Sequence, residues 1–322
     1  MEADFPVWKE YAYRQGIHQA VISYLDVRSE NFCRIENTVD GKRFATARGW
    51  EDLSRMLQVY EMLGKTADRE VIFQYIQHRT IAKDFANYLE LYYKYKTDYN
   101  IGELLEGKWS SAALQKIRTA AFDEHLSIIS LLNGRLGGMF RECFLQDAYV
   151  AKLYEYLIYY RDSQSVMMLD DVRAMAEKDL EEQKRAEQLT REQEQIQHRV
   201  IETLNRFSLE IKGEIFVGDG ALDEVREMFG REKEELERMT EHTSDALDNA
   251  FRFLEDAFGE SQEMVAFVTE LNANYYSVWF INENGNDLYY RHNKGLLFEA
   301  RHENVVKQME EAENMLNSVL KS

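Results

Sequence analysis

The sequence predicts an all-α protein, and three observations lead to this prediction. The 322 residues contain one proline, Pro6, where average usage of about 5% would give around sixteen. Apolar residues recur at three- and four-residue steps through most of the chain, as on one face of an amphipathic helix. Hydrophobic residues make up 45% of the sequence, which excludes wholesale disorder despite a net charge of −19. Turn-rich sandwiches and barrels are therefore disfavoured, and long helices in about two domains are expected.

Charge and hydropathy restrict the classes of binding partner and the cellular compartment that we expect for this protein. The 58 acidic residues outnumber the 39 lysines and arginines, whereas a nucleic-acid surface needs clustered positive charge. No apolar run approaches the ~20 residues that span a bilayer, and the N-terminus has no apolar signal segment. We expect a cytoplasmic protein with neither a nucleic-acid nor a membrane partner.

The first 46 residues predict one or two short helices and one hairpin. Residues 5–30 carry helical periodicity that is broken at Gly16. Residues 32–46 consist of two short stretches around Asp40 and Gly41, a pair that accepts the positive φ angles of a type I′ turn. This is the only good β signal in the sequence.

Two further helices complete the first predicted domain. One begins near Ala47 and ends at Gly64, and another covers about 68–99. Polar and glycine residues punctuate the next segment, so we predict a domain boundary near residue 100. The first domain is residues 1–100 and the second is residues 101–322.

The second domain is predicted to be helical throughout. Residues 110–162 read as two helices joined by a turn at 133–138. Residues 165–213 suit one long, highly charged helix, and residues 221–258 run back along it after a turn at Val217–Gly220. We expect a long, coiled-coil-like antiparallel hairpin over about 165–258. A last amphipathic helix is expected from about Glu299.

The sequence contains no complete active site. It has no GxxxxGK[ST] phosphate loop, no HExxH and no GxSxG, and we predict no metal site. The seven histidines are dispersed and read as surface or interface residues. Cys33 and Cys143 form no metal or redox spacing and read as small buried hydrophobes of a reducing compartment.

One stretch, Thr46-Ala47-Arg48-Gly49, allows two interpretations. An arginine in the first turn opposes the helix dipole, and pairing with Glu51 or Asp52 explains it structurally. Alternatively, Arg48 and the free amides of the turn bind an anion, since a helix N-terminus beside a guanidinium is a phosphate site. Gly49 then permits close backbone approach. Lys42 and Arg43 on the hairpin add positive charge.

Residues 5–95, and most clearly FCRIENTVDGKRFATARGWEDLSRMLQVYEMLG, resemble the helical lid subdomain of MoxR-like AAA+ ATPases. In that family an arginine at the start of a lid helix, the sensor-2 arginine, reaches the γ-phosphate of ATP. The resemblance assigns this role to Arg48, with Thr46 and Gly49 beside it. The remaining residues resemble the helical extensions of some bacterial members.

The resemblance implies an accessory function rather than catalysis by this chain alone. The α/β core with Walker A and Walker B motifs is missing, so ATP and Mg²⁺ are expected only when the chain is joined to such a core. The implied partners are the AAA+ core, neighbouring subunits, and a client or adaptor protein, to which the hairpin would couple the nucleotide state. The alternative is a stand-alone helical scaffold that binds proteins and has no ATPase role. A helical enzyme built on carboxylates has no constellation of residues behind it.

Overall fold

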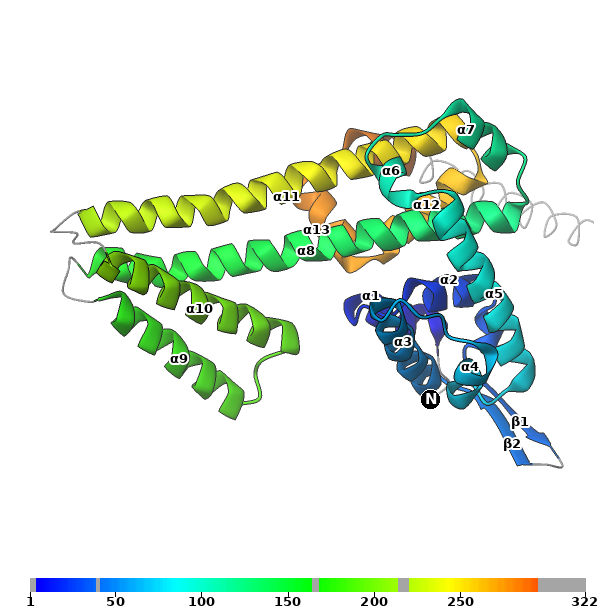
Figure 1. The fold of residues 1–322 in the computed structure, drawn as a ribbon, viewed down its shortest axis with the longest axis horizontal. Helices are drawn as coiled ribbons and strands as arrows, with labels where there is room; N and C mark the ends of the chain where they lie inside the picture. The colour runs from blue at the N-terminus through cyan, green and yellow to red at the C-terminus, as the bar shows by residue number, and fades with distance from the viewer. Residues whose placement is uncertain (1–3, 39–40, 164–167, 214–219, 295–322) are drawn as a thin grey trace, which may run out of the picture. The chain divides into compact units, whose positions relative to one another are not determined.

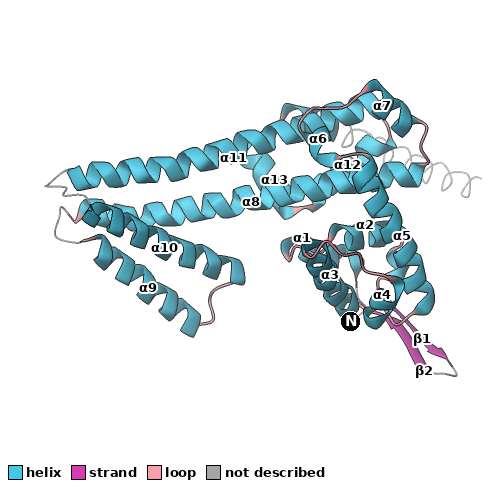
Figure 2. Cartoon of the chain, in the orientation of Figure 1, coloured by secondary structure: helices cyan, strands magenta, loops and turns pink. Residues whose placement is uncertain are grey.

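A computed structural model describes residues 4–38, 41–163, 168–213 and 220–294 (Figure 1). In this part of the chain the structure is helical except for one antiparallel β-hairpin (Figure 2), so the predicted all-α class is confirmed. The chain forms two compact units. The first comprises residues 1–137 and 245–322, and the second comprises residues 138–244. These units differ from the division near residue 100 that the glycine and polar residues of the sequence predict.

The first unit begins with two short helices, where the sequence predicts one or two, and with the predicted hairpin. Gly16 separates the helices with a φ of 63°. The strands pair from Arg34↔Ala45 to Thr38↔Gly41, and Asp40 lies outside the described residues. The elements of this part are α1 (Phe5–Arg14), α2 (Gln19–Val27), the 3₁₀ turn η1 (Ser29–Asn31), β1 (Arg34–Thr38), β2 (Gly41–Ala45), α3 (Ala47–Met62), α4 (Arg69–Tyr75) and α5 (Arg79–Asp98).

An aromatic cluster holds α3 against α2 and α5. Trp50 is fully buried, and its indole N–H donates to the carbonyl oxygens of Asn31 at 3.3 Å and Phe32 at 3.1 Å. Its ring centroid lies 5.6 Å from that of Tyr24 and 5.3 Å from that of Phe85. Burying these rings removes a large apolar area from water while the indole N–H stays hydrogen-bonded.

The single helix predicted over 68–99 is two helices, because the chain turns at residues 76–78. Asp68 caps α4 by accepting from the Val71 N–H at 2.9 Å. His78 caps α5 through Nδ1, and its own backbone N–H donates to the Phe44 oxygen at 3.0 Å. The contact with β2 uses a donor of the turn, and an unbroken helix would have kept that donor within its own ladder.

The remaining elements of the first unit follow the position where the sequence predicts a boundary. They are α6 (Ile101–Leu105), α7 (Ser111–Arg118), the N-terminal part of α8 (Phe122–Asp162), the C-terminal part of α11 (Gly220–Phe258), α12 (Gln262–Ala273) and α13 (Tyr275–Asn284). Residues 287–294 are also helical, and the helix predicted from Glu299 lies outside the described residues.

The predicted turn at 133–138 is wrong, because α8 passes through these residues without a break. The glycines serve packing instead. A Cβ at Gly134 would lie 2.5 Å from Cγ of Gln19, and one at Gly137 would lie 2.9 Å from Nδ2 of Asn274. Glycine in a helix costs about 1 kcal/mol relative to alanine, and the close approach of these neighbours explains why the cost is accepted.

The second unit is a bundle of four helical segments. It comprises α8 from residue 138, α9 (Leu169–Arg185), α10 (Arg191–Gly213) and α11 as far as residue 244. Buried residues of all four segments form one core, and the largest members are Tyr149, Tyr156 and Phe207. The Sγ atom of Cys143 lies 3.3 Å from the Thr243 hydroxyl, and the Tyr154 ring stacks on Phe229 at 5.6 Å. Because the later residue of α8 meets the earlier residue of α11, the two helices run antiparallel.

The predicted long helix over 165–213 is wrong, because α9 and α10 form an antiparallel pair around a turn at residues 186–190. Glu187 adopts a left-handed φ of 52°. The Thr190 N–H donates to Oε1 of Gln193 at 2.9 Å, and the Gln193 N–H donates to the Thr190 hydroxyl at 3.2 Å. This reciprocal capping box starts α10. The arm predicted over 165–258 is therefore part of a bundle, and residues Val217–Asp219 of its predicted turn lie outside the described residues.

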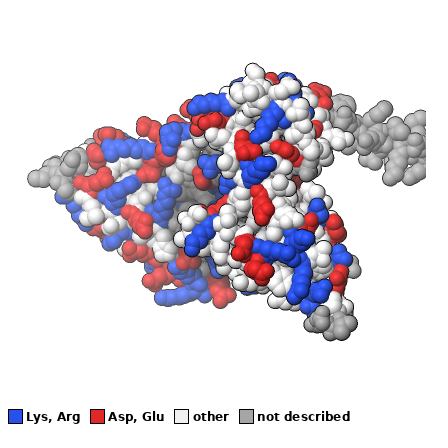
Figure 3. All heavy atoms as spheres, turned by 45° about the vertical axis from the view of Figure 1, so that its right-hand side comes forward, with Lys and Arg blue, Asp and Glu red and all other residues white. Residues whose placement is uncertain are grey.

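Charges of both signs are interspersed on the surface drawn in Figure 3. Many form helical ion pairs at i,i+3 or i,i+4, such as Arg238 with Glu235 and Arg252 with Asp248. Exposed pairs of this kind contribute little to stability. Within the described ranges, no helix has the length and apolarity needed to cross a bilayer.

We predict that alanine has opposite effects at two glycines of α8. Gly134→Ala should lower the free energy of unfolding by about 1–3 kcal/mol, because the added methyl group overpacks against Gln19. Gly138→Ala is the matched control, since nothing lies within 4 Å of its Cβ position. Here the gain in helix propensity should stabilise by about 0.5–1 kcal/mol. Urea denaturation of both variants measures this, and equal changes would contradict the continuous, closely packed helix.

Candidate functional site

The predicted anion site at the start of α3 is exposed but already has partners within the chain. Thr46 is the N-cap, and its hydroxyl accepts from the Gly49 N–H at 3.1 Å. Arg48 is 77% exposed in its side chain, and its Nε donates to Oδ2 of Asp52 at 3.1 Å. This bond to Asp52 raises the pKa of Arg48. The pairing at i,i+4 is one of the two that the structural interpretation predicts.

The other predicted partner of Arg48 is used elsewhere. Glu51 accepts from Arg55 on the next turn of α3 and from the Tyr11 hydroxyl at 3.3 Å. Arg48 is therefore held by a single carboxylate. An exposed pair of this kind is weak enough to open for a stronger anion.

Gly49 permits close approach, as predicted, but the group that approaches belongs to the chain itself. A Cβ at Gly49 would lie 2.7 Å from the Tyr75 carbonyl oxygen at the end of α4. The glycine therefore serves the packing of α3 against α4. With its N–H bound by Thr46, Gly49 offers no donor to a ligand.

The basic residues of the hairpin lie close by in sequence and face their own strand partners. Arg43 is opposite Glu36, and Lys42 is opposite Asn37. Thr46, Arg48 and Gly49 lie together at one helix end, and the hairpin leads directly into it. Taken together, the site can offer one guanidinium to an anion.

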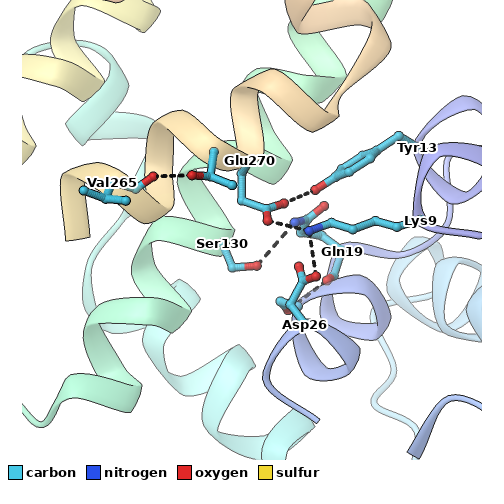
Figure 4. A network of polar contacts seen from close by, with 9 residues as sticks. Lys9, Tyr13, Gln19, Asp26, Ser130, Val265 and Glu270 are labelled. Carbon is cyan, nitrogen blue, oxygen red and sulfur yellow. Dashed lines mark hydrogen bonds and ion pairs between the residues drawn. The ribbon is translucent and has the colours of Figure 1, made fainter. Parts of the chain in front are cut away.

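The sequence gives no signal for a partly buried charge cluster on three helices. Lys9 of α1 lies between two carboxylates, at 2.6 Å from Oδ1 of Asp26 and 2.5 Å from Oε1 of Glu270 (Figure 4). The Tyr13 hydroxyl donates to the other oxygen of Glu270. The three charged side chains are only 13% to 27% exposed. They join α1 and α2 to α12, which follows more than 230 residues later in the chain.

Burial and the proximity of like charges shift the pKa values in this cluster. Burial first, and then the Glu270 carboxylate, raise the pKa of Asp26 to about 7, although Lys9 acts to lower it. Burial acts to lower the pKa of Lys9, but Glu270 and Asp26 outweigh it and raise the value. Burial, followed by Glu270, raises the pKa of Tyr13 well above its usual range. Perturbed groups beside a cleft are candidates for function.

A cleft of about 370 Å³ lies beside the cluster, between α2, α8 and α12. This volume is within the range of small-molecule sites. Asp26 and Glu270 form the charged part of its wall. The rest of the lining is apolar or carries hydroxyl groups: Ser23, Val27, Leu126, Ile129, Ser130, Ala266 and Thr269.

The histidines and cysteines differ in part from the prediction. His18 and His78 are buried and cap α2 and α5 with Nδ1, while their Nε2 atoms face Glu61 at 3.4 Å and Glu36 at 3.1 Å. Their capping role was not foreseen, although each stands directly before a helical run. Cys143 is buried as predicted, and the prediction for Cys33 is wrong because its side chain is exposed.

No group of three or more histidine, cysteine or acidic side chains is arranged to hold a metal ion among the described residues.

We predict that two carboxyl groups affect stability with opposite pH dependence. The pKa of Asp26 is raised from 3.8 to about 7, so the folded state binds this proton more tightly than the unfolded state does. The contribution of Asp26 to the free energy of unfolding therefore falls as the pH rises toward 7. The bond from His18 lowers the pKa of Glu61 from 4.5 to about 2. Glu61 therefore stabilises the fold at pH values above its unfolded pKa, and this stabilisation is lost as the pH falls toward the folded pKa.

Unfolding free energies of the wild type, Asp26→Asn and Glu61→Gln between about pH 4 and about pH 8 test this prediction. Relative to wild type, Asp26→Asn should become less destabilising as pH rises. Glu61→Gln should become more destabilising over the same range. The same direction for both variants would show that Asp26 ionises without penalty.

The chain was also compared with known proteins. Neither the family models, nor the curated proteins, nor the solved structures contain a significant match to it.

Proposed function

We propose that residues 1–100 act as the lid of a MoxR-like AAA+ ATPase, to which Arg48 contributes a sensor-2-type contact with ATP. The α/β core, with its ATP and Mg²⁺, is then the principal partner. The rest of the chain is the accessory region that couples nucleotide state to neighbouring subunits and to a client or adaptor protein, in the cytoplasm. The proposal rests on the resemblance of residues 32–64.

The observation that supports it most is how Arg48 is presented. Its side chain is 77% exposed in the first turn of α3, while the helix behind it is fixed by fully buried Trp50 and by the contact of Gly49 with Tyr75. A rigid helix that displays a guanidinium at its first turn suits a contact that must be placed accurately on a phosphate. Among the described residues its ion-pair partner is Asp52, a half-exposed carboxylate that a γ-phosphate can replace.

A second candidate is the stand-alone protein-interaction scaffold. Two observations favour it. Every predicted site residue has a partner within the chain, and the tyrosine-rich segment of α8 leaves Tyr154 and Tyr159 about half exposed while Tyr149 and Tyr156 are buried. Exposed tyrosines are enriched at protein interfaces. This candidate predicts that Arg48 has no effect on any ATPase.

The chain alone should neither hydrolyse ATP nor bind it tightly. A guanidinium at a helix end lacks the phosphate loop and the Mg²⁺ ligands that position and neutralise a triphosphate. Isothermal titration calorimetry with Mg-ATP measures this, and micromolar affinity for the isolated chain would contradict the division of labour proposed here.

Replacing Arg48 should reduce ATP turnover when the chain is combined with a MoxR-like core, with little change in melting temperature. An arginine finger is worth about 10³–10⁵ in rate, and a sensor that also binds the ground state should be worth less. Arg48→Lys should rescue poorly, because an ammonium lacks the planar two-pronged contact. Phosphate release and melting temperature are measured on the same samples.

The matched control is Arg55→Ala. Arg55 is an exposed arginine of the same helix and pairs with Glu51 and Asp52. It should leave turnover unchanged. Equal turnover for Arg48→Ala and wild type would reject the lid proposal and favour the scaffold.

A further inference from the structure

The cleft between α2, α8 and α12 combines an apolar wall with an unbalanced charge. Its α8 side is formed by Leu126, Ile129 and Ser130, none of which is charged. The carboxylates of Asp26 and Glu270 lie on the opposite elements and share the Lys9 ammonium. When both acids are ionised, this group of three carries one net negative charge in a partly buried place.

Of the four carboxylate oxygens of Asp26 and Glu270, one is left available to accept a hydrogen bond from a ligand. Both oxygens of Glu270 accept, one from Lys9 and one from the Tyr13 hydroxyl. Among the described residues, only Lys9 donates to Asp26, and it reaches Oδ1. Oδ2 of Asp26 is the free acceptor, and Asp26 is both a lining residue of the cleft and the most exposed of the three charged groups at 27%.

Two of the three hydroxyl groups of the wall donate to their own helices, and the third, that of Ser130, accepts from Nε2 of Gln19 at 3.3 Å. The Ser23 hydroxyl donates to the Gln19 carbonyl oxygen at 2.9 Å and accepts from the Tyr88 hydroxyl at 2.8 Å. The Thr269 hydroxyl donates to the Val265 carbonyl oxygen at 2.8 Å (Figure 4). Oδ2 of Asp26 is therefore the charged acceptor that the cleft offers to a ligand, and Val27, Leu126, Ile129 and Ala266 form the apolar part of the wall.

We propose that this cleft binds a small organic cation, in which a primary ammonium pairs with Asp26 and an apolar body lies against Leu126, Ile129 and Ala266. The ammonium supplies the second positive charge that the two carboxylates lack. A partly buried carboxylate that is only partly compensated gains from a charge-assisted hydrogen bond. The apolar body gains from leaving water. Anions are repelled by the same two carboxylates, and the site is independent of the proposed contact at Arg48.

Proton release should accompany binding. In the empty cleft, burial and Glu270 raise the pKa of Asp26 to about 7, with Lys9 and Tyr13 as the other groups facing the pair. An ammonium favours the ionised carboxylate, while an alkylamine stays protonated up to about pH 10. Affinity should therefore rise between about pH 6 and about pH 8.

The experiment uses the full chain and hexylammonium chloride, with 1-hexanol and sodium hexanoate as probes of the same length. Binding is measured by calorimetry at pH 8. Hexylammonium should bind, and hexanol and hexanoate should bind at least about tenfold more weakly, because they lack the charged donor. Asp26→Asn should weaken hexylammonium by about tenfold to a hundredfold. Ala266→Leu, which fills the apolar part of the cleft, should weaken it too.

Glu260→Gln is the control, because it removes one exposed negative charge of the same unit away from the cleft lining. Melting curves of each variant establish that it is folded. The proposal is overturned if hexylammonium does not bind at millimolar concentration, or if hexanol binds as tightly. It is also overturned if Glu260→Gln weakens binding as much as Asp26→Asn, since the effect would then be a general one of net charge.

Discussion

Burial of the Trp50 side chain is the constraint on which the N-terminal part of the structure depends. The indole has no exposed surface and donates to carbonyl oxygens of the segment between α2 and the hairpin. Because the ring also packs on Tyr24 and Phe85, it joins α2, α3 and α5 at one point. The direction of α3 follows from this packing, and with it the place at which Arg48 meets solvent. The packing of the uncharged Trp50 side chain thus positions the charged side chain of Arg48.

The Lys9 cluster obeys a different balance. Taking ions out of water is expensive, and mutual attraction repays the cost only when the remaining acceptors are also satisfied. Here both oxygens of Glu270 accept a hydrogen bond, one from Lys9 and one from Tyr13, whereas Asp26 accepts only from Lys9 among the described residues. Burial, followed by the nearby Glu270 carboxylate, raises the pKa of Asp26, and Lys9 offsets this only in part. Such a cluster adds less to stability than an apolar contact of similar size would, which is why its position beside a cleft is informative.

Local signals explain which elements were predictable. Asp40-Gly41, Gly16 and the periodicity after Ala47 are governed by backbone preference and by amphipathic spacing, and both act within a few residues. The capping box at Thr190 and Gln193 is also a local signal, although the charged periodicity around it masked it. Gly134 misleads for the opposite reason. In isolation glycine weakens a helix, and only the approach of Gln19, distant in sequence, makes it the residue that fits.

The sequence by itself determined the helical class and the hairpin around Gly41, and it placed two possible acidic partners, Glu51 and Asp52, one turn from Arg48, because these depend on composition and on spacings of two to four residues. Tertiary structure decided that α9 and α10 pack on each other, that Gly49 faces Tyr75, and that Lys9, Asp26 and Glu270 meet. No periodicity encodes these meetings, since they join residues up to 261 positions apart. They arise because apolar faces of separate helices must be buried together, and the polar residues carried at the edges of those faces are brought into contact as a result.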